Sequence, residues 1–242
     1  MSDIIQSLWW GPMTNLERLS AASYIKNGHP YHLYTYATFG GIPNPPEGVV
    51  VKDAEDILPI SEVAPFAYLA NFADLFRVKL LLDRGGWWCD ADSVCLKPFD
   101  FPDETVLVRH IRWAGAEDQL MMFNAHFKLP AGSPVAAWMF DELRKYLTQR
   151  AYQNLDWEYA LQILTRAALK FDLPWQPARL FIPLPWWEWS KQLETTPFVI
   201  PEECYAIHLW HTEWSRSRFD RNAAYAPTCL YEQLKKRYLG AA

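Results

Sequence analysis

The stretch 72–98 constrains the fold of this chain more than any other segment. It contains apolar residues at helical spacing, then a Gly85-Gly86 pair, and then a short aromatic run that ends in two acids. Apolar residues three and four positions apart predict an amphipathic helix that packs on a sheet. Two glycines supply the left-handed backbone that ends a helix and reverses the chain. We therefore predict a helix, a tight turn and a buried strand in direct succession.

Two aspartates, Asp90 and Asp92, follow the predicted strand 87–89. Ligand sites of α/β proteins lie at such strand ends. Paired carboxylates bind hard cations such as Mg²⁺ or Mn²⁺, which keep positions open for phosphate oxygens. Asp74 and Arg77 are three residues apart and share one face of the predicted helix. Two interpretations of this pair stay open: an exposed ion pair of little energetic value, or a pair beside the metal that binds sugar hydroxyls.

The combined pattern resembles that of glycosyltransferases with a DXD sugar-binding region. This family includes initiating mannosyltransferases, lactosylceramide galactosyltransferases, bacterial capsule enzymes and, more distantly, clostridial glucosylating toxins. Its members share an Asp and an Arg on a helix, a Gly-Gly pair, an aromatic strand and an Asp-X-Asp motif. These positions are occupied here, in the same order and spacing, by Asp74, Arg77, Gly85-Gly86, Trp87-Trp88, Asp90 and Asp92. The resemblance implies a GT-A fold: a single α/β domain over residues 1–242, with a Rossmann-like, nucleotide-binding mixed sheet flanked by helices.

Length and composition favour one globular domain. A chain of 242 residues is long enough for one α/β core and short for two. The net charge of −5 and the lack of a long basic run give a nucleic-acid partner no electrostatic support. The sequence shows neither a signal peptide nor an apolar run of about 18 residues, so we expect a cytoplasmic protein. The cysteines lack metal-ligand spacing, which predicts free or buried thiols in a reducing compartment: Cys89, Cys95, Cys204 and Cys229.

The first predicted strand, residues 4–11, carries two adjacent tryptophans. In the resembling family this strand has the form Ile-His-x-x-Trp-x-Gly, and its Trp stacks on the nucleotide base. Trp9 matches this frame, whereas Gln6 replaces the family's His. Trp9 is therefore the predicted base-stacking residue, with Trp10 as the alternative because adjacent strand residues face opposite ways. The competing interpretation is that both rings belong to the core.

The other elements are predicted from periodicity and turn residues. We expect helices over 15–27, 134–146 and 157–169, strands over 31–36, 49–51, 105–109 and 120–123, and a surface loop over 40–48. The tail, 230–239, is predicted to be a basic amphipathic helix whose polar face is solvated or touches an anionic membrane. Segment 173–189, rich in Pro and Trp, is expected to form an acceptor pocket or an irregular core layer. His29 is interpreted as structural.

Asn124 stands at the end of a predicted strand. The resemblance implies that an Asn near this point faces the donor sugar or the acceptor. The alternative is an Asn that closes the strand into a turn.

The C-terminal region supplies one more candidate ligand. Alternating apolar residues around His208 predict a strand with this His on the opposite face. The resemblance implies that His208 completes the metal shell, with His211 as the alternative. It also implies that Trp214 lies on a mobile loop, residues 211–220, which closes over the donor. Thr212-Glu213 replaces the Gly-Ser that precedes the loop Trp in the family.

These residues, with the resemblance, predict a metal-dependent, retaining glycosyltransferase. It moves a hexose from a UDP- or GDP-sugar to a glycan, glycolipid or other hydroxyl acceptor, as in polysaccharide biosynthesis, with Mn²⁺ or Mg²⁺ as cofactor. Asp90 and Asp92 form the expected metal site, with Asp92 the direct ligand and Asp90 the contact to ribose or metal-bound water; Asp74 and Arg77 hold the sugar. In a retaining reaction the leaving phosphate oxygen takes the acceptor proton, so no side-chain base is needed. The alternatives are a nucleotide-sugar hydrolase or nucleotidyltransferase, and a non-catalytic glycan-binding module.

Overall fold

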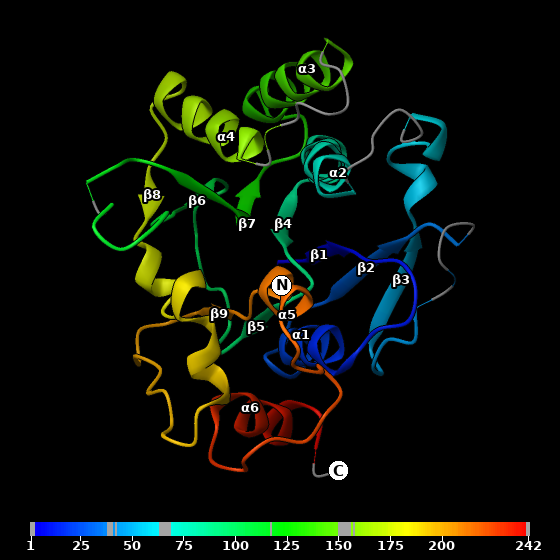
Figure 1. The fold of residues 1–242 in the computed structure, drawn as a ribbon. Helices are drawn as coiled ribbons and strands as arrows, with labels where there is room; N and C mark the ends of the chain where they lie inside the picture. The colour runs from blue at the N-terminus through cyan, green and yellow to red at the C-terminus, as the bar shows by residue number, and fades with distance from the viewer. Residues whose placement is uncertain are drawn as a thin grey trace.

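The computed structural model of the chain describes residues 3–37, 41, 43–62, 69–116, 118–149, 156 and 158–240, with the backbone alone at 69 and 149. Within these ranges, one mixed sheet has seven strands in the order β3-β2-β1-β4-β7-β6-β8 (Figure 1). Its strands are β1 (Ile5–Leu8), β2 (Tyr31–Thr35), β3 (Val49–Asp53), β4 (Gly86–Cys89), β6 (Val106–Arg109), β7 (Met122–Leu129) and β8 (Trp175–Gln176). A smaller antiparallel sheet pairs β5 (Ser93–Cys95) with β9 (Ala206–His208).

Strand direction changes once the chain leaves β4. Strands β1, β2, β3 and β4 pair in parallel, whereas β7 runs antiparallel to both β4 and β6. The parallel half needs crossover connections, and helices supply two of them. This combination is the mixed sheet that the resemblance implied.

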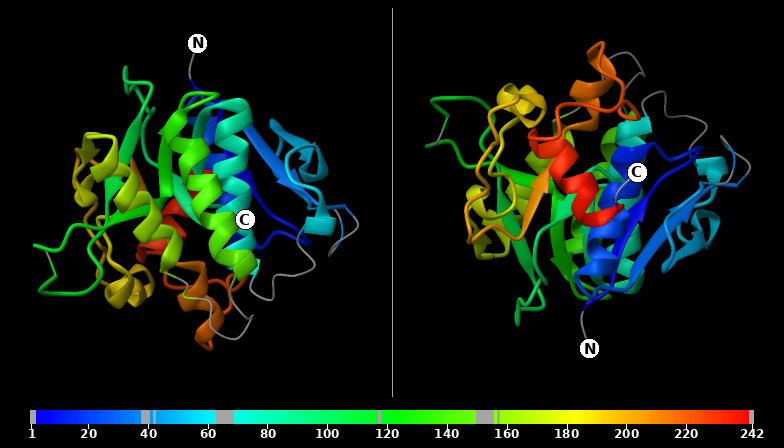
Figure 2. Two further views of the ribbon diagram at one scale, coloured as in Figure 1. Left: turned by 90° about the horizontal axis from the view of Figure 1, so that it is seen from above. Right: turned by 90° about the horizontal axis from the view of Figure 1, so that it is seen from below.

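Helices cover both faces of the large sheet. They are α1 (Asn15–Lys26), α2 (Leu69–Arg84), α3 (Pro134–Gln149), α4 (Tyr159–Lys170), α5 (His211–Arg216) and α6 (Leu230–Tyr238). Figure 1 shows α2, α3 and α4 on one side and α1 and α6 on the other. Figure 2 shows the same arrangement from above and below, with α6 beside α1. The predicted α/β architecture, a mixed sheet flanked by helices, is confirmed.

Strand β4 lies at the centre of the sheet and is buried on both faces. Trp87 and Trp88 are fully buried, and because neighbouring strand residues point to opposite sides they enter different parts of the core. Trp88 packs with Phe76 of α2, whereas Trp87 packs with Phe99 and Phe181 beneath the other face. The aromatic run therefore holds β4 in place, and the residues that directly follow the strand are held with it.

The turn between α2 and β4 requires its two glycines. Gly85 and Gly86 have φ angles of +65° and +89°, which residues with a Cβ adopt at a cost. A Cβ on Gly85 would also lie 2.5 Å from the backbone nitrogen of Ala131. The predicted succession of helix, tight turn and buried strand is confirmed, and the turn connects α2 directly to β4.

Several predicted boundaries differ from the structure. The first strand ends at Leu8, before the two tryptophans. The predicted strand 120–123 is the longer β7, so Asn124 lies inside a strand and not at its end; the interpretation as a turn-closing Asn is wrong. Segment 211–220, predicted as a loop, begins with the helix α5. Gly40 and Ile42 of the predicted loop 40–48, and Trp157 of the predicted helix 157–169, lie outside the described residues.

The four cysteines are free and buried, as predicted. The predicted tail helix is present as α6. Among the described residues, no helix combines the length and apolar character needed to cross a bilayer.

Candidate metal centre and its two pockets

Three side chains with metal-ligating atoms lie together where β4 ends. The backbone N–H of Asp90 donates to the carbonyl of Ala125 in β7, at 2.9 Å, and the N–H of Ser93 donates to the carbonyl of Asp90, at 3.0 Å. This turn holds Asp90 and Asp92 at the strand end. Pairing of β5 with β9 then sets His208 opposite Ser93. One ligating atom each from Asp90, Asp92 and His208 lie within 4.8 Å of one another.

Charge explains how this cluster is held although Asp92 and His208 are buried and Asp90 is partly buried. Nε2 of His208 lies 3.2 Å from Oδ1 of Asp92 and 3.8 Å from Oδ2 of Asp90. Burial alone lowers the pKa of His208, but the two carboxylates outweigh it and raise that pKa to about 9. Burial raises the pKa of Asp92, yet the charge of His208 and the N–H of His211, at 2.7 Å, hold it below its ordinary value. For Asp90, Arg77 is the main charge that overcomes burial and lowers the pKa.

The donor set fits a divalent cation. Two carboxylates and one imidazole suit ions such as Mn²⁺ and Mg²⁺. Neighbouring ligands of a six-coordinate ion lie about 3 Å apart, which is close to the 3.2 Å between His208 and Asp92. Neither ring nitrogen of the buried His208 has a hydrogen-bond partner of good geometry among the described residues. Buried polar atoms without such a partner call for an explanation, and a bound ion is one.

Arg77 connects the cluster to helix α2. Its guanidinium lies 3.2 Å from carboxylate oxygens of both Asp74 and Asp90, and it donates to the carbonyl of Asn124 at 2.6 Å. Nδ2 of Asn124 donates in turn to Asp74 at 2.9 Å. The indole N–H of Trp88 donates to Asp90 at 2.7 Å. The structure therefore brings together all the residues predicted to hold the metal and the sugar.

The pair formed by Asp74 and Arg77 is not an exposed ion pair. The two residues are 6% and 7% exposed, so the interpretation as a surface pair of little value is wrong. Burial raises the pKa of Asp74 to about 7, against the effect of Arg77, whose charge is shared with Asp90. A buried carboxylate held this way retains lone pairs for further hydrogen bonds.

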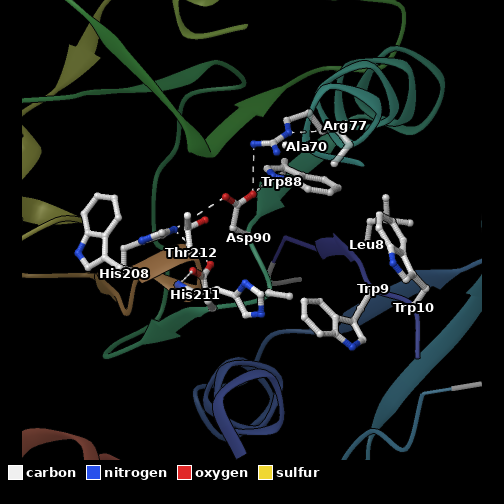
Figure 3. A pocket seen from close by; sticks show the side chains of 14 residues that line it. Leu8, Trp9, Trp10, Ala70, Arg77, Trp88, Asp90, His208, His211 and Thr212 are labelled. Carbon is white, nitrogen blue, oxygen red and sulfur yellow. Dashed lines mark hydrogen bonds and ion pairs between the residues drawn. The ribbon is translucent and has the colours of Figure 1, made fainter. Parts of the chain in front are cut away.

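A first pocket, with a cavity volume of about 390 Å³, opens on one side of the cluster (Figure 3). Trp9 and Trp10, predicted as alternatives, both line it. The prediction that only one of them faces the site fails because β1 ends at Leu8. Beyond the strand, successive side chains no longer point to opposite sides. Both rings are partly buried, so neither is a plain core residue.

His211, the alternative metal ligand, serves the cluster through its backbone. Its N–H is the one that donates to Asp92. Its ring lies 3.7 Å from a carboxylate oxygen of Glu17 and meets the ring of Trp9 edge-on at 5.3 Å. The ring is therefore outside the group of His208, Asp90 and Asp92.

A second pocket, of about 330 Å³, lies on the other side of the same residues. Arg77, Asp90 and His208 line both pockets, so the two cavities meet at the candidate metal centre. Asp74 and Asn124 line only the second one. From there the cavity continues past residues 110–113 toward η5 (Trp186–Leu193).

Trp210, which no sequence argument singled out, stands between the pockets. Its φ of +61° is unusual for a residue with a side chain, and its ring packs edge-on against His208 at 4.3 Å. Its indole N–H donates to the carbonyl of Leu184 at 2.8 Å. Strained backbone of this kind gathers at functional sites. No pattern in the sequence signals it, because a left-handed Trp follows from tertiary packing.

Trp214, the predicted loop tryptophan, lies in the core instead. It is 1% exposed, packs against Tyr231 at 4.9 Å, and lines neither pocket. Its indole N–H donates to the carbonyl of Leu209 at 2.9 Å. These contacts are those of a core residue, and they explain why the ring is buried.

Two further residues lie away from the pockets. Gln6, at the position of the family's His, donates to the carbonyl of Gly85 at 2.7 Å and thus supports the α2–β4 turn. His29 is structural, as predicted: its Nε2 accepts from the N–H of Phe99 at 2.9 Å, and burial lowers its pKa.

Comparison with known proteins gives limited similarity. No protein-family model matches the chain, and no curated protein does. Similar solved structures include one titled PaToxG Glycosyltransferase, with 17% identity, a TM-score of 0.49 and 70% of each chain covered. Two others are titled as transferase structures. The mutant one has 11% identity and a TM-score of 0.43 over 69% of this chain and 84% of its own. The other has 10% and 0.40 over 71% and 85%. Similarities at this level do not establish a family.

Proposed function

We propose that this chain is a metal-dependent glycosyltransferase of GT-A type, which transfers a hexose from a UDP- or GDP-sugar to a hydroxyl acceptor. The observation that carries the proposal is the cluster of Asp90, Asp92 and His208 at the junction of two pockets. The first pocket offers Trp9 and Trp10, and the second offers the polar groups of Asp74 and Asn124. A donor with a flat base at one end, a diphosphate in the middle and a sugar at the other end matches this order.

Each part of the donor has a partner in this arrangement. In the first pocket, Trp9 and Trp10 present aromatic rings to the base. Asp90, Asp92 and His208 would hold the cation, which supplies charge stabilisation for the departing diphosphate when bound. In the second pocket, Asp74, Arg77 and Asn124 are set to bind the hydroxyls of the hexose. They already hydrogen-bond one another, so the site is organised before the sugar arrives, which reduces the entropy that binding costs.

We further propose that transfer retains the anomeric configuration, as the resemblance implies. The acceptor hydroxyl then adds on the face that the diphosphate leaves, and its proton passes to the leaving phosphate oxygen. NMR of the product anomer, recorded before it equilibrates, tests this point.

The experiment that tests the function measures consumption of UDP- and GDP-hexoses with Mn²⁺, with and without acceptor. Thermal shift first identifies the donor, because a ligand that binds the folded state raises its melting temperature. We expect Asp92→Asn to lose Mn²⁺-dependent donor binding and to lower transfer by about 100-fold or more, with a similar fold. Its amide oxygen still accepts from the N–H of His211. Asp103→Asn, on an exposed loop, is the control.

The rival functions give different outcomes. If the donor is cleaved to free sugar and no acceptor becomes glycosylated, the protein is a hydrolase. Release of inorganic diphosphate indicates a nucleotidyltransferase. Glycan binding that ignores Mn²⁺, with no turnover, indicates a binding module. Wild-type donor affinity in Asp92→Asn overturns the metal assignment.

A further inference from the structure

The lining of the second pocket extends beyond the residues proposed to bind the hexose. Its inner end is formed by the residues proposed to bind the hexose. Its outer part is formed by segments that are distant in sequence, among them Arg112 and Trp113 after β6, Glu158 before α4, and Trp186 in η5. The proposed function assigns these outer residues no contact with the donor.

The outer part presents two exposed indole rings in fixed positions. Trp113 is 41% exposed and Trp186 is 38% exposed. The N–H of Trp186 donates to the carbonyl of Arg112 at 2.6 Å, and the guanidinium of Arg112 lies 4.6 Å from the ring centre of Trp113. Large apolar rings that are held in place beside a cavity, yet exposed to water, are suited to contact a ligand.

The charges around the outer part compensate one another. Arg112 binds both carboxylate oxygens of Glu158 through two of its nitrogens. Arg216 lies 3.1 Å from Glu213. Among the described residues that line this pocket, every Asp, Glu and Arg has an ion-pair partner. A phosphate or carboxylate ligand in the outer part would therefore compete with Glu158 or Glu213 for the two arginines, whereas hydroxyl groups can use the remaining lone pairs and N–H groups.

We propose that the outer part of this pocket is an acceptor subsite for a neutral carbohydrate, an inference that rests on the proposed function. The apolar face of a sugar ring packs on Trp113 or Trp186, while its hydroxyls bind the ion pair of Arg112 and Glu158. A neighbouring hydroxyl then faces the donor sugar. Its oxygen bonds to the anomeric carbon, the bond from that carbon to the phosphate oxygen breaks with its electron pair going to the diphosphate, and the hydroxyl proton goes to that oxygen. A cavity of about 330 Å³ admits such a ring but excludes a folded protein surface.

The test measures KM for acceptor and for donor separately, with Mn²⁺ present and a panel of neutral oligosaccharides. We expect Trp186→Ala and Glu158→Gln to raise the acceptor KM by about tenfold, and by more than they raise the donor KM. Trp175→Ala is the matched control: its ring is 41% exposed on β8 but lines neither pocket, so both KM values stay unchanged. Melting temperatures show whether each variant is folded. If one of the two variants is misfolded, saturation-transfer NMR of a third variant, Trp113→Phe, with the best oligosaccharide replaces the kinetic measurement.

The outcomes separate this inference from the function on which it rests. If the wild type consumes no nucleotide sugar, the proposed function is wrong. If it consumes donor but glycosylates only peptides or anionic glycolipids, the neutral-carbohydrate subsite is wrong while the function stands. Equal changes in donor and acceptor KM for Trp186→Ala also overturn the subsite.

Discussion

The two pockets meet at Arg77, Asp90 and His208 but otherwise have different walls. The first is lined by the end of β1, helix α2, strand β4 and the turn after it, all within the first 92 residues, together with a short C-terminal stretch. The second combines aromatic rings with several charged pairs and is assembled from segments between residue 70 and residue 216. Two adjacent tryptophans suit a base that many donors share, whereas paired charges suit the pattern of hydroxyls that distinguishes one sugar from another. We therefore expect the first pocket to bind the nucleotide and the second to select the sugar.

Arg77 lines both pockets, and its removal should have the largest effect. In Arg77→Ala, two buried carboxylates, Asp74 and Asp90, lose their shared partner, which costs about 3–5 kcal/mol in the free energy of unfolding. Urea denaturation measures this loss. Lys79→Ala is the control, because it breaks an exposed pair with Asp83 on the same helix and should change stability by less than about 1 kcal/mol. Equal losses in the two variants would show that Arg77 is not a structural link between the pockets.

Asp74 lines the second pocket alone, so its removal should affect the sugar and not the nucleotide. At pH 8, where Asp74 is mainly ionised, we expect Asp74→Ala to weaken binding of the nucleotide sugar by about 1.5–3 kcal/mol, the value of a hydrogen bond to a charged group. Binding of the free nucleotide diphosphate should stay nearly the same. Calorimetry with both ligands measures the difference. Equal losses for the two ligands would instead indicate a structural ion pair and would remove the distinction between the pockets.

The two tryptophans of the first pocket should show the opposite behaviour. Trp9→Ala and Trp10→Ala are expected to weaken binding of nucleotide sugar and of free nucleotide by the same amount, about 1–3 kcal/mol for a lost stacking contact. The same calorimetry checks this. If only one variant has an effect, the base stacks on that ring and the other only shapes the wall. A loss confined to the nucleotide sugar would contradict the assignment of the first pocket to the base.

The difference between the pockets also explains what the sequence could predict. Asp74, Arg77, Asp90 and Asp92 belong to one continuous helix–turn–strand unit, so local spacing was enough to bring them together. His208 lies on β9, more than a hundred residues further on, and its place rested on the resemblance; pairing of β5 with β9 puts it there. The sequence could not indicate which of two adjacent tryptophans faces the site, because that depends on where β1 ends.

The chain after His208 was the least predictable part of the site. Trp214 was expected over the donor and lies in the core, while Trp210, four residues earlier, stands between the pockets. Both are aromatic residues near a candidate ligand, and their sequence context does not distinguish them. What separates them is the left-handed backbone at Trp210, which turns the chain so that α5 packs Trp214 inward. The outer wall of the second pocket was likewise hidden, since Arg112 and Glu158 meet only in the folded chain.

The smallest predicted effect concerns the junction itself and depends on pH. Without metal, the pKa of His208 is about 9, so this residue is protonated at pH 7 and must lose its proton to bind a cation. Mn²⁺ affinity should therefore rise by up to about tenfold per pH unit, equivalent to about 1.4 kcal/mol, and level off near pH 9. The raised pKa of His208 also stabilises the metal-free fold. This stabilisation is complete below pH 6.5 and is lost as the pH rises through about 9.

Calorimetry in two buffers of different ionisation enthalpy counts the released protons, and about one per Mn²⁺ is expected at pH 7. His211→Gln is the control: burial lowers the pKa of His211, so its ring binds a proton less readily than an ordinary His, and its backbone N–H to Asp92 survives the change. Proton release that persists in His208→Gln, or is absent from the wild type, would exclude His208 as a ligand and leave the two aspartates alone at the junction.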